Sequence, residues 1–269
     1  MSTIRIAVAS TPLTATLAEA VPAAVAAVEE AGRLGAAIVL LPETGLPGHR
    51  MQKRPVEDAT QAALDAAVRE VAVAARRARV ATIVGTERPT LAGPREIVQV
   101  VIGADGVTLG EQTKTQMDPS EELQYVASQG RRVFDVAGVK VGIVICHESF
   151  RYPEITRALV LAGAQIVFAP HYVTTRDGSL PVRWLDPASP YNEKALMCRA
   201  MENTVFVAAA NSAAPNQGSA TCIIGPDGAL VASVAYGQVG VAVAELDLER
   251  ATRLIARRWA PERSVRFAE

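Results

Sequence analysis

The feature that most constrains this fold is a repeated junction, in which a helix leads into a short apolar strand that stops at a proline. The two segments are "GAAIVLLP" (35–42) and "GAQIVFAP" (163–170), and each follows a stretch with helical periodicity. Strands that are apolar at every position are typical of sheets covered on both faces, as in α/β proteins. The pair predicts a pseudo-symmetric α/β architecture, although any helix that leads into a buried strand has a similar pattern.

The rest of the chain continues the alternation of helices and strands. Helical periodicity covers 16–35, 57–79, 153–163 and 192–203. Strand patterns cover 4–10, 36–42, 80–87, a hairpin at 96–112, two strands within 131–146, and then 164–170, 204–210, 219–225, 229–235 and 239–246. The segments without a clean period, read as loops, are 114–130 and 173–190. Because no Pro/Gly-rich linker divides the chain, we expect one domain over 1–269.

Composition and charge exclude several classes of protein. Hydrophobic residues make up 49% of the chain, which is enough for a sizeable core, and the net charge is −1. Nucleic acid and anionic membrane surfaces are therefore not expected partners. Three cysteines, no signal-peptide pattern and no apolar run of membrane-spanning length predict a cytoplasmic protein.

Cys146 stands in "GIVICHESFRYPE" (142–154), where an apolar strand gives way to polar residues. The thiol can be a nucleophile, a metal ligand or an inert core group. The chain has three histidines and neither Cys-x-x-Cys nor His-x-x-x-His spacing, which disfavours a metal. Neighbours on a strand point to opposite faces, so His147 is a poor base for Cys146. This stretch alone leaves open a buried, inert cysteine.

Glu43 occupies the same kind of position, directly after "IVLLP". In open α/β sheets the carboxyl ends of strands face the ligand crevice, so this carboxylate and the Cys146 thiol can converge on one pocket. A carboxylate can serve as general base for a thiol, and a nearby ammonium favours the thiolate. Lys114, just after "VTLGEQT", is the candidate ammonium.

The order Glu43, Lys114, Cys146, in the contexts "LLPETGLPG", "EQTKTQ" and "GIVICHESFRYPE", resembles the nitrilase superfamily of carbon–nitrogen hydrolases. Two later segments, "RAMENTVFV" (199–207) and "SATCIIGPDGAL" (219–230), resemble further motifs of that family. The resemblance therefore covers almost the whole chain. The loop "TQMDPSEE" after the lysine departs from the family pattern and leaves the substrate undefined.

The resemblance implies an α/β fold of the nitrilase type, a four-layer α-β-β-α sandwich, and an amidase-like activity. Cys146 is then the nucleophile, and Glu43 is the general base. Lys114 stabilises the negative oxygen of the tetrahedral intermediate, together with the backbone N–H of His147. The implied substrate is a small amide or carbamoyl compound, hydrolysed through a thioester without a metal or an organic cofactor.

Further site residues follow from the same resemblance. Family members often have an extra Glu in the loop after the lysine. Glu121 and Glu122 both fit, and the offset from "YVASQG" favours Glu122 as the catalytic one. Acidic residues at a helix start are the alternative explanation. His147 is expected to border the substrate pocket, and so are His171 and Tyr172, because they directly follow the repeated strand unit.

Several polar residues near these motifs are expected to be structural. Glu148 and Glu154 are expected to tie the nucleophile turn and its helix together. Arg199, Glu202 and Asn203 form a buried polar brace. His49, after "GLPG", is interpreted as a loop histidine rather than a catalyst.

Three other hypotheses remain. The same triad can hydrolyse nitriles or transfer acyl groups, the chain can be a non-catalytic dimeric scaffold, or it can be an unrelated cysteine hydrolase that uses His147. The long C-terminal extension common in nitrilases is missing, which favours amide or carbamoyl substrates. The resemblance also implies a homodimer or higher homo-oligomer, with helix 153–163 at the interface.

Overall fold

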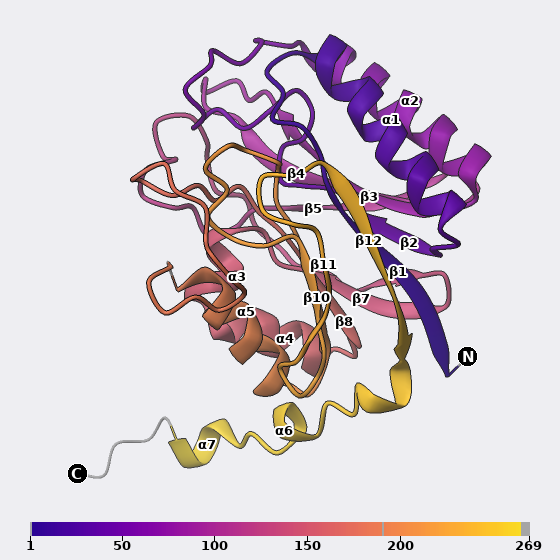
Figure 1. Cartoon of the computed structure of the whole chain (residues 1–269), viewed down its shortest axis with the longest axis vertical. Helices are drawn as coiled ribbons and strands as arrows, with labels where there is room; N and C mark the ends of the chain where they lie inside the picture. The colour runs from indigo at the N-terminus through magenta and orange to yellow at the C-terminus, as the bar shows by residue number, and fades with distance from the viewer. Residues whose placement is uncertain (1, 190, 265–269) are drawn as a thin grey trace.

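Two six-stranded sheets lie face to face and are covered on their outer faces by helices (Figure 1). The computed structural model describes residues 2–189 and 191–264, so the ends of the predicted 1–269 domain and residue 190 lie outside the described residues. One outer layer is α1 (Leu17–Arg33) and α2 (Gln61–Ala78), and the other includes α4 (Pro153–Leu161) and α5 (Asn192–Met201). The predicted α-β-β-α sandwich is confirmed.

The two sheets have the same pattern of strand directions. The first is β12-β1-β2-β3-β4-β5, built from β1 (Thr3–Ser10), β2 (Ile38–Leu40), β3 (Ala81–Arg88), β4 (Glu96–Ile102), β5 (Thr108–Thr113) and β12 (Gly240–Asp247). The second is β6-β7-β8-β9-β10-β11, built from β6 (Phe134–Val136), β7 (Val139–Ile143), β8 (Ile166–Pro170), β9 (Phe206–Ala210), β10 (Cys222–Ile224) and β11 (Leu230–Ser233). Each has three parallel strands flanked by antiparallel ones. The repeated segments supply β2 and β8, the middle strands of the two parallel triplets, as pseudo-symmetry requires.

Side chains of β1 alternate between two hydrophobic cores. Ile6 and Val8 point into the core between the sheets, which also contains Phe168 of β8. Ala7 and Ala9 point the other way, into the core beneath α1 and α2. The period of two follows from strand geometry, and both faces are apolar because both are covered.

The two long helices of the first layer begin at threonines. The hydroxyl of Thr16 accepts the Glu19 N–H at 3.2 Å, and that of Thr60 accepts the Ala63 N–H at 3.3 Å. Each bond satisfies a donor that has no partner inside the helix. These caps explain why the helices begin there.

The structure differs from the predicted elements mainly beside Cys146. The strand expected to reach residue 146 ends at Ile143, and a short helix, α3 (His147–Arg151), follows directly after Cys146. The predicted loop 114–130 contains neither helix nor strand. Beyond β12 lie a 3₁₀ turn (Leu248–Arg250), α6 (Leu254–Arg257) and α7 (Pro261–Ser264). Within the described ranges, every helix falls short of the length and apolarity needed to cross a membrane.

Candidate active site

Glu43, Lys114 and Cys146 meet in the structure, each shortly after the end of a strand. Glu43 follows β2, Lys114 follows β5, and Cys146 follows β7. All three are buried, with exposed fractions of 1%, 0% and 7%. One side-chain atom each of Glu43, Cys146 and Glu121 lie within 4.8 Å of one another. The sequence-based expectation that these distant strand ends converge agrees with this geometry.

Lys114 is the cation between two carboxylates. Its Nζ donates to Glu43 Oε1 at 2.8 Å and to the two oxygens of Glu121 at 2.9 and 2.7 Å. Burial alone lowers the pKa of an ammonium, but the charges of Glu43 and Glu121 outweigh burial and raise the pKa of Lys114 above its usual value. The cluster of carboxylates and thiol has the spacing of a metal site, yet the Lys114 ammonium already binds both carboxylates.

Glu121, and not Glu122, is the second carboxylate of the site. Glu121 is 3% exposed, whereas Glu122 is exposed to solvent, so the prediction of Glu122 as the site residue is wrong. A turn orients Glu121 inward, because its N–H donates to Asp118 O at 2.8 Å and its Oε2 accepts the Asp118 N–H at 3.0 Å. Burial favours the neutral acid, but the nearby His49 and Lys114 lower the pKa of Glu121 to about 2.

Cys146 occupies a strained turn between β7 and α3. Its backbone has φ 51° and ψ −111°, in a region that non-glycine residues rarely adopt. Its N–H donates to Pro170 O at 2.9 Å, and its carbonyl accepts from the Ser149 N–H at 2.9 Å and hydroxyl at 2.6 Å. Burial and the charge of Glu43 raise the pKa of the thiol well above its usual value, against the opposing effect of Lys114. The resting sulfur is therefore a protonated thiol.

Glu148 joins the nucleophile turn to the lysine loop, a link that the sequence did not predict. Its Oε2 accepts the Ile145 N–H at 2.8 Å, while its Oε1 accepts the N–H groups of Thr115 at 2.6 Å and Gln116 at 3.2 Å. Arg131 pairs with the same carboxylate. A single buried charge thus fixes Cys146 relative to Lys114.

The predicted polar brace lies behind α3. Arg199 donates from Nε to Ser149 O at 3.0 Å, from Nη2 to Phe150 O at 3.2 Å, and from Nη1 to Glu202 at 2.9 Å. Asn203 Nδ2 in turn donates to Arg199 O at 2.9 Å. These bonds tie α5 to the helix that begins at the nucleophile.

His49 lies inside the site, which the sequence interpretation missed. It is 3% exposed, and its ring stacks on Tyr172 with the centroids 4.6 Å apart. Its Nε2 is 3.3 Å from Glu121 Oε1 and 3.6 Å from Glu43 Oε2. The residue belongs to a loop without periodicity, so no sequence signal indicated that its side chain turns inward.

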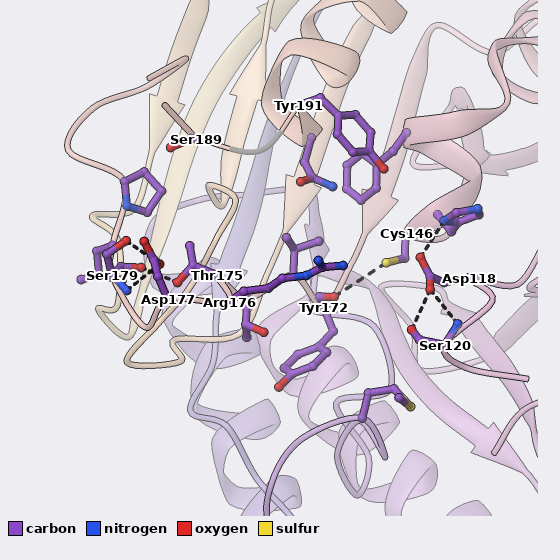
Figure 2. A pocket seen from close by; sticks show the side chains of 18 of the residues that line it. Asp118, Ser120, Cys146, Tyr172, Thr175, Arg176, Asp177, Ser179, Ser189 and Tyr191 are labelled. Atoms are coloured by element: carbon purple, nitrogen blue, oxygen red, sulfur yellow. Dashed lines mark hydrogen bonds and ion pairs between the residues drawn. The ribbon is translucent and has the colours of Figure 1, made fainter. Parts of the chain in front are cut away.

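A cleft of about 980 Å³ opens above Cys146 (Figure 2). His147 and Tyr172 line it, as predicted, and the Tyr172 N–H donates to Glu43 Oε2 at 3.0 Å. His171 does not line the cleft, because its side chain is fully buried and its Nδ1 lies 2.9 Å from Ala169 O. Burial lowers the pKa of His171 to about 4, which makes it a neutral core residue.

The cleft walls come from the two segments predicted as loops. On one side Asp118 accepts from Ser120 and lies 3.0 Å from His147 Nδ1, close to the nucleophile (Figure 2). The other wall is formed by the polar segment from Thr175 to Ser179 and by Tyr191. This cleft can hold a small organic molecule with its reactive carbon at the buried sulfur.

Comparisons with known proteins found a matching family model and several relatives. A family model described as carbon-nitrogen hydrolase matches residues 5–256. A nitrilase from Pyrococcus abyssi is 27% identical over 239 residues, 82% of this chain and 80% of its own. An (R)-stereoselective amidase from Pseudomonas sp is 34% identical over 114 residues, 42% of this chain and only 36% of its own.

The solved structures include a mutant amidase from Nesterenkonia sp. AN1 that shows covalent addition of the acetamide moiety of fluoroacetamide at the active site cysteine. It matches with a TM-score of 0.78 and 22% identity over 96% of this chain and 94% of that chain. At this identity the match shows a shared fold.

Proposed function

This chain belongs to the carbon–nitrogen hydrolase family, in the amidase-like branch of the nitrilase superfamily, and on that premise we propose that it hydrolyses a small amide or carbamoyl compound through a thioester on Cys146. The observation that carries the proposal is the buried cluster in which Lys114 Nζ lies 2.8 Å from Glu43 and the Cys146 sulfur lies beside both carboxylates. A nucleophile, a proton acceptor and a fixed positive charge thus face one cleft.

The first step requires a base beside the thiol. Because burial keeps Cys146 protonated, the sulfur has to lose its proton as it attacks the carbonyl carbon. Glu43 is the acceptor, since its Oε1 and Oε2 are held by Lys114 at 2.8 Å and the Tyr172 N–H at 3.0 Å. Two donors fix the orientation of this carboxylate, which is what a positioned general base needs.

The negative oxygen of the tetrahedral intermediate has two donors. Lys114 supplies a charged one, and the His147 N–H, the first of α3, has no acceptor within its own helix. One donor of this type is worth roughly 3 kcal/mol of transition-state stabilisation.

The intermediate collapses when the carbon–nitrogen bond breaks. Glu43 returns its proton to the leaving nitrogen, and ammonia or an amine departs. Glu43 then takes a proton from a water molecule, which attacks the thioester carbon, and the acid is released with the proton returned to Cys146. Glu121 keeps Lys114 in place during both halves.

The proposal is tested by a screen of acetamide, ω-amides of dicarboxylic acids and N-carbamoyl amines, with intact-mass detection of an acyl adduct. The wild type should release acid and ammonia, and Cys146→Ala should form neither product nor adduct. Turnover by that variant would refute the mechanism, and full activity of Glu43→Gln would refute the assignment of Glu43 as the general base. Acid formed from nitriles but not from amides would favour nitrile hydrolysis on the same triad.

We also propose a cytoplasmic homodimer that uses the outer face of α4 and α6. Leu161, Ile255 and Trp259 are exposed at 48%, 44% and 46%, and Arg157 of α4 lies over the Trp259 ring. Apolar side chains grouped on one face are typical of an interface. A monomer at micromolar concentration in sedimentation experiments would contradict this assembly.

A further inference from the structure

His49 makes a set of contacts that the steps above do not use. Its Nδ1 accepts the Met51 N–H at 3.3 Å, so in the neutral ring the proton resides on Nε2. Nε2 lies 3.3 Å from Glu121 Oε1 and 3.6 Å from Glu43 Oε2. Nε2 forms a well-aligned hydrogen bond with neither oxygen. This position suits a donor that two carboxylates share.

The ring is held firmly in that place. It stacks on Tyr172 at 4.6 Å with an angle of 19° between the planes, and it meets Tyr125 at 5.5 Å. The Tyr125 hydroxyl accepts the Arg50 N–H at 2.9 Å, next to His49 in the chain. Two aromatic rings and two backbone contacts therefore fix the direction of Nε2.

The two carboxylates need different protonation behaviour, although both contact the same ammonium. Glu43 has to accept the thiol proton, whereas Glu121 has to stay ionised to hold Lys114. The shorter His49 contact is to Glu121, and His49 is one of the groups that lower the pKa of this carboxyl. A donor on Glu121 makes Glu43 the easier of the two to protonate.

We propose that His49 is a positioning residue, whose Nε2–H keeps Glu121 ionised against Lys114 and thereby reserves Glu43 as the proton acceptor. The inference rests on the proposed amide hydrolysis. The two carboxylates that share Lys114 then have different roles: Glu121 holds the lysine, and Glu43 accepts the proton. His49 lines the cleft as well, but the sulfur and the outer cleft stay intact when it is replaced. The loss of the donor should therefore lower kcat by a larger factor than it changes KM.

The test compares two variants of His49. Asparagine can keep the Met51 contact but is too short to reach the carboxylates, whereas glutamine can place an amide N–H near the position of Nε2. We expect His49→Asn to lower kcat roughly 10- to 100-fold, the usual effect of losing a bond that orients an active-site group. His49→Gln should retain most of kcat, and in His49→Asn the factor by which KM changes should be smaller than the factor by which kcat falls.

A double mutant separates positioning from general packing. In a Glu121→Gln background, His49→Asn should cause little further loss of kcat, because its target is already gone. Equal kcat in the Asn and Gln variants, or fully additive losses in the double mutant, would overturn the inference. If His49→Asn fails to fold, His49→Phe, which retains the stacking but has no donor, replaces it in both comparisons. Turnover by Cys146→Ala would instead refute the underlying amide hydrolysis, so the two failures are distinguishable.

Discussion

Glu121→Gln, compared with Glu122→Gln, tests which of two adjacent carboxylates belongs to the site. The Glu121 carboxylate bonds to Lys114 at 2.7 and 2.9 Å and is buried, whereas Glu122 is exposed. Glutamine has nearly the same shape as glutamate, so the change removes charge and an acceptor with little change in volume.

The magnitude follows from the carboxyl's pKa, which falls from its usual 4.5 to about 2 on folding. At about 1.4 kcal/mol for each unit of pKa, the ionised form contributes up to about 3 kcal/mol to the free energy of unfolding at pH 7. Because the folded-state pKa is the lower one, this contribution is present above pH 4.5 and disappears as the pH falls towards 2. Glu121→Gln should therefore lose up to about 3 kcal/mol at neutral pH and progressively less in acid.

The measurement is urea unfolding of the wild type and both variants at pH 7 and at several values below pH 4.5, with kcat determined in parallel. Glu122→Gln should remain within about 0.5 kcal/mol of the wild type and keep its kcat, as expected for an exposed side chain. Glu121→Gln should also lower kcat, because Lys114 loses one of its two anionic partners. Equal behaviour of the two variants, or a loss that does not shrink in acid, would refute the reasoning.

Three other changes test separate parts of the structure. Glu148→Gln leaves the Ile145 N–H or the Thr115 N–H without its charged acceptor. It should lower the free energy of unfolding in urea by about 3–5 kcal/mol and also lower kcat. An unchanged kcat would contradict the role of Glu148 beside Cys146. Alkylation of Cys146 by iodoacetamide, followed by intact mass, should be slow at pH 7 and accelerate only well above the usual thiol pKa. Fast labelling at neutral pH would show a preformed thiolate. Phe168→Ala removes a fully buried ring between the sheets and should cost about 3–5 kcal/mol in thermal unfolding, and a loss below about 1 kcal/mol would show that the core collapses around it.

The alternation of helices and buried strands could be predicted because its signal is local and periodic, whereas the four-layer sandwich and the roles of the triad came from the resemblance to a known family. The segments that became β2 and β8 are apolar throughout, and Glu43 and Cys146 stand just beyond such strands. A residue directly after a strand can be placed well, because the pairing register of the strand fixes where the chain leaves the sheet. Lys114 could be placed for the same reason, directly after β5.

The errors lie where the backbone leaves periodic structure. Whether Glu121 or Glu122 turns inward depends on the tight turn at Asp118, whose bonds have no sequence period. His49 is placed by stacking on Tyr172, a contact between distant loops. His171 was expected in the pocket because it follows β8, but its side chain alternates away from Tyr172 and into the core. Five-residue helices such as α3 are too short to show helical periodicity.

The pairing of the last strand with the first has a consequence for biosynthesis. All eight residues of β1 pair with β12, from Thr3 opposite Asp247 to Ser10 opposite Gly240. A ribosome must therefore synthesise the chain from β1 as far as β12 before the first sheet can close this edge. Until then the unpaired N–H and C=O groups of β1 can bind another strand. Nascent chains on one mRNA are therefore most prone to aggregate late in translation.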